Sequence, residues 1–203
     1  MAKLGLTQNN MEQKKVIALT GGIGSGKSYA LKVLESNGYQ ILSSDAIVCD
    51  LYEKRKIKLM LKKLFPTAVK GFFSPVIDRK QISSIVFNDN QMLIRLTDLI
   101  TPLVMAEIEK RVKKLSGKIF VEVPLLFECG YQNNFDGVIV ITRDKNSRIE
   151  SVKKRSNLTE EHILKRMESQ FDYQNADLTP YTVIDNDGRE DFENKILSVA
   201  KNV

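Results

Sequence analysis

The chain has 203 residues, 42% of them hydrophobic, which is enough for one substantial core and a smaller appendage. Its 31 basic and 25 acidic residues give a formal net charge of +6. No apolar run approaches the roughly 20 residues that span a bilayer, and the first residues lack the apolar core of a secretory signal. We therefore expect no membrane partner.

The positive charge is concentrated in short clusters such as Lys54-Arg55-Lys56 and Lys110-Arg111. Such clusters are compatible with nucleic-acid binding, with solvated helix faces or with attraction of small polyanionic substrates. No aromatic stacking motif and no Cys/His finger accompany them. We favour the last two interpretations and expect no nucleic-acid partner.

The cysteine content bears on the cellular compartment. Cys49 and Cys129 are isolated, without metal-type spacing or a disulfide framework. They are expected to be packing residues in a reducing, cytoplasmic environment.

The first predicted elements frame a glycine-rich turn. Residues 16–20 form a continuous apolar run, which is typical of a parallel strand covered on both faces. Residues 27–36 carry an apolar helical stripe that stops at Asn37-Gly38, and residues 39–42 predict a short second strand.

A mostly helical segment follows the second strand. Helices are predicted over 47–64, 79–87 and 91–114. Pro102 is expected to start or kink a helix rather than lie inside a regular one. This segment is a natural candidate for a substrate-binding subdomain.

The rest of the chain alternates strands and helices. Strands are predicted over 119–123, 137–142 and 182–184, two helices over 147–170 and a closing helix over 191–199. This alternation predicts a parallel α/β sheet.

Two N-terminal caps are predicted for the helices within 147–170. Ser147 and Glu150 form a possible capping box, and Thr159 followed by two acids resembles a second N-cap. The sole histidine, His162, follows these acids and is expected to be a surface or capping-region residue.

The run Gly21-Gly22-Ile23-Gly24-Ser25-Gly26-Lys27-Ser28 fits the pattern G-x-x-x-x-G-K-[ST] between the first strand and the first helix. Glycines let such a loop aim its N–H groups at phosphate oxygens, and the helix N-terminus adds positive partial charge. Lys27 would reach the β- and γ-phosphates, and the Ser28 hydroxyl would bind Mg²⁺. The sequence therefore predicts a nucleoside triphosphate site formed by Gly22, Ile23, Gly24, Ser25, Gly26, Lys27, Ser28 and Tyr29.

Asp45 follows the second strand, so it projects toward the same edge of the sheet as the glycine-rich loop. It could accept the proton of an attacking hydroxyl group or hold Mg²⁺ through water. It could also be the N-cap of a helix that begins near Ala46. These roles can coexist.

Two further charged positions fit a phosphotransfer site. Glu122 lies near the end of the strand at 119–123, where P-loop proteins often hold the metal, and a buried carboxylate must be paired or bound to metal. Arg155 belongs to a basic cluster, and an arginine supplied by a lid could offset the charge of a moving phosphoryl group. The alternative for this cluster is an exposed basic face.

These segments together resemble dephospho-coenzyme A kinases over nearly all of residues 15–190. The glycine-rich run followed much later by Val-Pro-Leu-Leu-Phe-Glu is far more specific than a bare P-loop. The resembling pieces are Ile17 to Ser28, Asp45, Asp78-Arg79, Val86-Phe87, Pro102-Leu103, Val123 to Glu128, Arg155, Thr159 with His162, Gln170, and Val183 to Gly188.

The resemblance implies transfer of the ATP γ-phosphoryl group to the ribose 3′-hydroxyl of dephospho-CoA, the last step of coenzyme A synthesis, with Mg²⁺ as cofactor. It implies a three-layer α/β/α P-loop NTPase fold with a parallel sheet, a helical acceptor-binding insertion and a helical lid. The core would comprise residues 14–45 and 116–203, including a lid at about 147–170. The insertion would comprise 46–115, and 1–13 would be a disordered extension.

The same resemblance assigns roles by position. Asp45 would be the general base, Lys27 the phosphate clamp, Ser28 the Mg²⁺ ligand and Arg155 the lid arginine, while Asn186 would lie near the adenine. The acceptor would be bound by Asp45, Arg79, Pro124 and Leu125. We expect ATP and dephospho-CoA as substrates of a monomer or weak homo-oligomer.

Three positions depart from the family pattern. Ser43-Ser44-Asp45 stands where acid-Ala-Asp is common, so one acid is lost while the expected base remains. Thr101 replaces a histidine, which puts an acceptor contact in doubt, and Tyr29 replaces a threonine. None of these changes removes an essential group.

Two other functions remain open at this point. A nucleoside or nucleoside-monophosphate kinase would share the core and the lid. A non-enzymatic P-loop protein that regulates or binds nucleic acid would use ATP as a switch.

Overall fold

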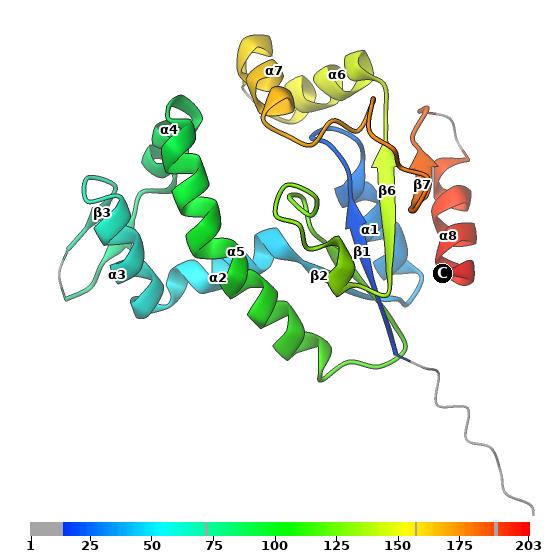
Figure 1. Ribbon diagram of the computed structural model, residues 1–203, viewed down its shortest axis with the longest axis horizontal. Coiled ribbons are helices and arrows are strands. Elements are labelled where there is room, and N and C mark those ends of the chain that lie inside the picture. Colours follow the sequence, from blue (N-terminus) through cyan, green and yellow to red (C-terminus); the bar gives the residue numbers. More distant parts are fainter. Residues whose placement is uncertain (1–13, 72, 157, 189–190) are drawn as a thin grey trace, which may run out of the picture.

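The structure is a computed structural model, and it describes residues 14–71, 73–156, 158–188 and 191–203. The predicted extension at 1–13 lies outside the described residues. The central sheet consists of parallel strands in the order β2-β5-β1-β6-β7 (Figure 1). The strands are β1 (Lys15–Thr20), β2 (Gln40–Ser43), β5 (Lys118–Glu122), β6 (Gly137–Thr142) and β7 (Thr182–Asp185), each within one residue of its predicted bounds.

Helices cover both faces of this sheet: α1 (Lys27–Ser36) and α8 (Phe192–Asn202) lie on one face, α2 (Ser44–Glu53) and α5 (Asn90–Val112) on the other. Side chains of each strand alternate between the two cores. In β1, Ile17 and Leu19 pack with α1 and α8, whereas Ala18 packs with α2 and α5. The predicted three-layer α/β/α architecture with a parallel sheet is therefore confirmed.

Between β2 and β5 the chain forms a mostly helical insertion to one side of the sheet (Figure 1). Besides α2 and α5, it contains α3 (Arg55–Leu64), α4 (Arg79–Asn88) and an antiparallel hairpin of β3 (Val69–Lys70) with β4 (Val76–Ile77). The hairpin was not predicted, because two-residue strands are too short to show an alternating pattern.

The sequence pattern predicts one helix over 47–64, and this prediction is wrong. Lys54 is extended, with φ −71° and ψ 124°, and separates α2 from α3. The break turns α3 so that Ile57 and Leu61 are buried in the same core as α2. Helix-favouring residues on both sides conceal the break in the sequence.

Pro102 lies inside α5, so the expected helix start at this residue is also wrong. Proline cannot donate the hydrogen bond that the Asp98 carbonyl would accept. Ile100 and Val104, on either side of it, are both buried in the core of the insertion. This packing outweighs the local cost of the proline.

Above the sheet stand α6 (Lys145–Arg155) and α7 (Glu160–Glu168), which we call the lid helices (Figure 1). Asp144 caps α6 by accepting from the N–H of Ser147, so the predicted capping box is wrong. An aspartate three residues before a free N–H is as good a cap as the predicted serine. Thr159 caps α7, as predicted.

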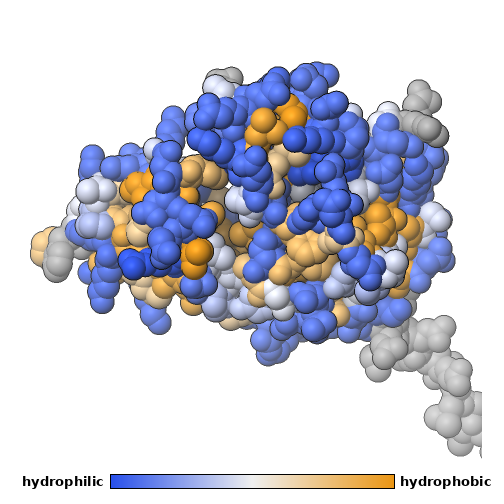
Figure 2. All heavy atoms as spheres, turned by 45° about the horizontal axis from the view of Figure 1, so that its top comes forward, coloured by the Kyte–Doolittle hydropathy of each residue, from blue (hydrophilic) through white to orange (hydrophobic). Residues whose placement is uncertain are grey.

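The lid helices present a mainly hydrophilic outer surface, with apolar residues confined to small patches (Figure 2). Within the described ranges, no helix combines the length and the apolar character that crossing a membrane requires.

Substitution of Phe120 provides a test of the layered core. This residue is fully buried in β5, and its ring contacts that of Tyr39 edge to face, with ring centroids 5.2 Å apart. Phe120→Ala should lower the free energy of unfolding by about 3–5 kcal/mol in chemical denaturation. Val183→Ala, at an exposed position of β7, should lower it by less than about 1 kcal/mol. Equal losses in the two variants would contradict this core assignment.

Candidate active site

An open cleft of about 1420 Å³ lies at the carboxyl ends of the strands, between the insertion and the lid helices. This is the edge at which parallel α/β sheets bind ligands. Two residues predicted for the site, Gly22 and Ser25, are buried and do not line the cleft. The predicted residues that do line it are Ile23, Gly24, Gly26, Lys27, Ser28, Tyr29, Asp45, Glu122, Pro124, Leu125, Arg155 and Asn186.

The glycine-rich loop takes backbone conformations that glycine adopts most readily. Gly21, Gly24 and Gly26 have φ angles of 145°, 79° and 113°. A Cβ at Gly26 would lie 2.5 Å from Asn186 Nδ2, and a Cβ at Gly24 would lie 2.5 Å from the backbone oxygen of Arg148. Because glycine has no side chain, the loop can make this turn, and Asn186 and Arg148 can approach its backbone closely.

Lys27 is buried against the loop to which it belongs. Its Nζ donates to the carbonyl oxygens of Gly21 and Gly22 over 2.7 and 3.1 Å. Burial lowers the pKa of Lys27 to about 8; Glu122 opposes this shift and Arg155 adds to it. An anion arriving in the cleft would favour the charged form of this lysine.

Glu122 ends β5 near Lys27 and is held by serine hydroxyls. Ser43 Oγ donates to its Oε2 over 3.2 Å, and Ser44 Oγ donates to its backbone oxygen over 2.6 Å, which joins the start of α2 to the end of β5. Burial raises the pKa of the Glu122 carboxyl, against the opposing effects of Lys27 and of hydrogen bonds from Ser43 and Ser28. Glu122 is buried, as considered from the sequence, and its carboxylate accepts a hydrogen bond from Ser43; a role in metal binding stays a prediction.

Asp45 lies in the first turn of α2 and lines the cleft. The helix already begins at Ser44, so the alternative in which Asp45 is the N-cap of a helix from Ala46 is wrong. Its side chain is exposed, and its charge acts on the titration of both Lys27 and Glu122. The cleft therefore brings two carboxylates close to the lysine of the loop.

Two arginines of the lid helices line the cleft. Arg155 is the last residue of α6, and Arg166 lies in α7. The Arg166 guanidinium sits over the Phe87 ring of α4, 4.0 Å from its centroid, so the lid helices touch the insertion. Both arginines can face an anion held by the loop.

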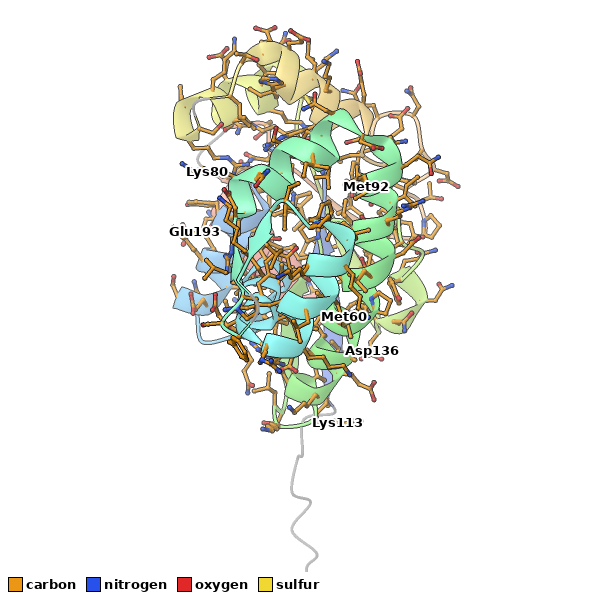
Figure 3. The ribbon with its side chains drawn as sticks, turned by 90° about the vertical axis from the view of Figure 1, so that its left-hand side faces the viewer. Met60, Lys80, Met92, Lys113, Asp136 and Glu193 are labelled. Atoms are coloured by element: carbon orange, nitrogen blue, oxygen red, sulfur yellow. The ribbon has the colours of Figure 1, made fainter. Side chains whose placement is uncertain are left out.

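Arg79, predicted to bind an acceptor, lies outside this cleft in an adjoining groove of about 740 Å³ between α4 and α7. Its guanidinium contacts Glu53 Oε1 at 3.4 Å, Cys49 Sγ at 3.1 Å and the Tyr52 ring at 5.5 Å. Figure 3 shows Lys80 at the edge of the insertion beneath the lid helices. The ionisable residues lining the groove are Arg79, Lys80, His162, Lys165 and Arg166, and none of the described lining residues is acidic.

Asn186, which follows β7, and Tyr29 of α1 both line the cleft. Figure 1 shows β7 on the side of the sheet away from the insertion. The Nδ2 of Asn186 donates to the carbonyl oxygen of Ser25 over 2.8 Å, which fixes it against the loop. Tyr29 stacks on Phe192 of α8, with ring centroids 5.9 Å apart. This end of the cleft thus offers an amide and an aromatic ring.

Sequence reasoning gave no role to two residues that hold the loop from the lid side. Arg148 Nε donates to the carbonyl oxygen of Ile23 over 2.8 Å, and the Ile23 N–H donates to Gln170 Oε1 over 2.7 Å. Arg148 precedes Arg155 by seven positions, or two helical turns, so both lie on the same helix face. That spacing was the signal available in the sequence.

Comparison with known proteins identifies the family. A family model described as dephospho-CoA kinase matches residues 15–191. A dephospho-CoA kinase of Thermus thermophilus is 32% identical over 186 residues, covering 91% of this chain and 89% of that protein. The chain belongs to the dephospho-CoA kinase family. Another dephospho-CoA kinase, from Helicobacter pylori, is 33% identical over 181 residues, covering 87% of this chain and 90% of its own.

Solved structures agree with membership of the dephospho-CoA kinase family. The dephospho-CoA kinase of Campylobacter jejuni has a TM-score of 0.67 and 28% identity, covering 94% of this chain and 97% of its own. A Thermus thermophilus protein has a TM-score of 0.81 and 30% identity, covering 94% and 98%. A deoxyadenosine kinase of M. mycoides, 14% identical with a TM-score of 0.51 and covering 92% and 97%, shares the fold alone.

The lowered pKa of Lys27 predicts how nucleotide affinity depends on pH. Lys27 is mainly charged below about pH 8 and mainly neutral above it, and the charged form attracts phosphate. Calorimetric titration with a non-hydrolysable ATP analogue should give a steady affinity near neutral pH and a falling affinity above pH 8. Lys27→Ala should bind more weakly and lose this alkaline inflection. An inflection that survives in the variant would assign the titration to another group.

Proposed function

We propose that this protein is a dephospho-CoA kinase, which transfers the γ-phosphoryl group of ATP to the ribose 3′-hydroxyl of dephospho-CoA in the last step of coenzyme A synthesis. The observation that carries the proposal is the family match over residues 15–191, in a chain whose cleft unites a phosphate-binding loop with an exposed carboxylate. ATP and dephospho-CoA are its small-molecule substrates.

ATP is proposed to bind with its phosphates on the glycine-rich loop. Lys27, which now bonds to carbonyl groups of its own loop, would turn to the β- and γ-phosphates. Asn186 and Tyr29 support an adenine position at the far end of the cleft, where an amide and a ring are available for hydrogen bonding and stacking.

Mg²⁺ is the cation proposed to accompany ATP. The Ser28 hydroxyl and the carboxylates of Asp45 and Glu122 line one cleft and are oxygen ligands of the kind that Mg²⁺ prefers. Ser28 lies close enough to Glu122 to help lower the pKa of its carboxyl, which supports their proximity. These residues therefore fit the cation, which when bound would neutralise charge on the phosphate oxygens.

Asp45 is proposed as the general base. Its carboxylate would take the proton of the 3′-hydroxyl while that oxygen forms a bond to the γ-phosphorus; the bond to the bridging β–γ oxygen breaks, and ADP leaves. Lys27 and Arg155, which both line the cleft, would offset the charge of the moving group. The exposure of Asp45 supports this role, because the acceptor can reach it directly.

The acceptor is proposed to enter from the insertion, which makes residues 46–115 its binding subdomain and leaves 14–45 and 116–203 as the nucleotide-binding core. Pro124 and Leu125 line the main cleft, where they can contact the acceptor nucleoside. Dephospho-CoA also carries a diphosphate and a long arm, so it extends beyond a nucleoside site. The adjoining basic groove, which includes Arg79, suits that diphosphate.

One assay tests the proposed function. Purified protein is incubated with ATP, Mg²⁺ and dephospho-CoA, and the products are identified by mass spectrometry as CoA and ADP. Parallel incubations with a panel of nucleosides and nucleoside monophosphates test the other kinase activity. Phosphorylation of that panel without CoA formation would overturn the proposal, as would salt-sensitive nucleic-acid binding without any phosphorylated small molecule.

The cellular compartment and the oligomeric state are also proposed. Both cysteines are free thiols, which suits a reducing compartment, and we propose the cytoplasm. We also propose a monomer or weak homo-oligomer.

Asp45→Asn tests the proposed base. The variant should lower kcat roughly 10²–10⁴-fold, since an amide cannot accept the hydroxyl proton. Its affinity for ATP should stay within a few fold, because the loop is unchanged. Asp50→Asn, which alters an exposed acid of the same helix outside the cleft, should keep near-normal kcat. Near-normal turnover by Asp45→Asn would reject this residue as the base.

Arg79→Ala and Lys80→Ala test the acceptor groove. Each should raise KM for dephospho-CoA roughly two- to fivefold, as expected for loss of a partly exposed ion pair worth up to about 1 kcal/mol. KM for ATP should not change. Arg95→Ala, at an exposed position of α5 that lines neither cavity, provides the control. A rise in KM for ATP alone would contradict the proposal that the diphosphate of dephospho-CoA binds in this groove.

A further inference from the structure

The peptide groups of Ile23, at the tip of the glycine-rich loop, are held on both sides by the lid region. Its carbonyl oxygen accepts from Arg148 Nε over 2.8 Å, and its N–H donates to Gln170 Oε1 over 2.7 Å. Arg148 belongs to α6, and Gln170 follows the end of α7. A single loop residue therefore connects two segments that the chain separates by a whole helix.

The Ile23 side chain strengthens this connection. It packs against the small core of the lid helices, which consists of Ile149, Val152 and Ile163. The loop thus places one apolar residue in the core of the lid while its glycines remain around the phosphate site. Moving the lid helices away from the loop would expose this core as well as break both hydrogen bonds.

Arg148 lies behind the loop rather than in the cleft. It is 7% exposed and is not among the residues that line the cleft. A Cβ at Gly22 would lie 2.3 Å from its Nη2, so the guanidinium packs directly on the loop backbone. From there it supports the loop without standing among the groups that face a ligand.

Gln170 is fixed by the residues that follow it. The N–H of Phe171 donates to Glu128 Oε1 over 2.8 Å, and the Phe171 ring lies 4.6 Å from that of Phe127. Tyr173 Oη is 3.2 Å from Thr20 Oγ1 at the end of β1. The Gln170 amide is therefore carried on a segment anchored to the same strand that leads into the loop.

We propose that Arg148 and Gln170 are positioning residues that join the glycine-rich loop to the lid helices, so that a nucleotide which orders the loop also places Arg155 over the phosphates. The link to Arg155 is the α6 helix itself, because Arg148 and Arg155 lie two turns apart, or about 10 Å along one rigid axis. The catalytic part of the proposal rests on the proposed kinase function.

Substitutions at Arg148 separate positioning from charge. Arg148→Gln keeps an N–H donor at the place of Nε but removes the charge. Arg148→Lys keeps the charge, and Arg148→Met keeps neither. Arg148→Met should lower kcat roughly five- to tenfold, the effect of one net hydrogen bond, with KM for dephospho-CoA little changed. Arg148→Gln should recover most of this loss.

Recovery by Arg148→Lys but not by Arg148→Gln would mean that Arg148 acts through its charge, and the proposal would fail. Failure of both to improve on Arg148→Met would overturn it as well. Lys145→Met, an exposed change on the same helix, is the matched control and should leave kcat, KM and the melting temperature as they are.

A double-mutant cycle tests whether both residues act through Ile23. Gln170→Met alone should resemble Arg148→Met, and the double variant should lose much less than the product of the two single losses. Independent, multiplying losses would show that the two residues do not act as a unit.

Hydrogen exchange provides a readout that does not depend on catalysis. In the wild-type protein an ATP analogue should slow amide exchange in both the loop and α6, whereas in the double variant it should protect the loop alone. Equal protection of α6 in both proteins would overturn the proposal even if the kinetics agreed. If the wild-type protein formed no CoA, the proposed function would fail, and this exchange measurement would still decide the coupling.

Discussion

A lysine and a glutamate, each less than one-tenth exposed, are buried close together where β1 and β5 end. Removing such groups from water is costly unless they are paired and hydrogen-bonded. Carbonyl groups of the loop accept hydrogen bonds from Lys27, and the hydroxyl group of Ser43 donates one to Glu122. The loop and the start of α2 must therefore keep their places relative to the sheet, and with them Asp45.

The burial of Lys27 beside the cleft also affects how charge is distributed around the cleft. Cationic groups approach from the loop and from the lid helices. Burial is the main cause of the lowered pKa of Lys27; Glu122 opposes it, and repulsion from Arg155 adds to it. A polyphosphate placed between them relieves this repulsion, so binding energy is available from groups that are already in position. Asp45 lies in the first turn of α2, where the insertion begins, so the acceptor hydroxyl group is expected to approach from that side.

Sequence patterns predicted elements best where local chemistry marks their ends. The bounds of α1 were predicted to the residue, because the glycine-rich loop precedes it and Asn37-Gly38 follows. The break at Lys54 left no such mark, since it is set by how α3 packs on the insertion core. Tertiary packing of this kind cannot be derived from a helical period alone.

The positions of the candidate site residues were likewise predictable from the sequence in some cases and not in others. Motif positions such as Lys27 and Asp45 share one cleft, because strand ends and loops place them there. Arg79 lies in the adjoining groove instead, because its helix is oriented by contacts across the insertion. Arg148 matches no motif. Its spacing from Arg155 indicates a shared helix face, but its contact with the loop is shown only by the hydrogen bond to the Ile23 carbonyl oxygen.

Ser43 illustrates how one neutral side chain can alter an anionic pocket. An acid at this position would add a third negative charge beside Glu122 and Asp45, and like charges at close range disfavour ionisation. The serine contributes a donor in its place. The pocket can consequently keep its shape before any cation binds. No ion is needed to screen the carboxylates of the pocket from one another while the site forms.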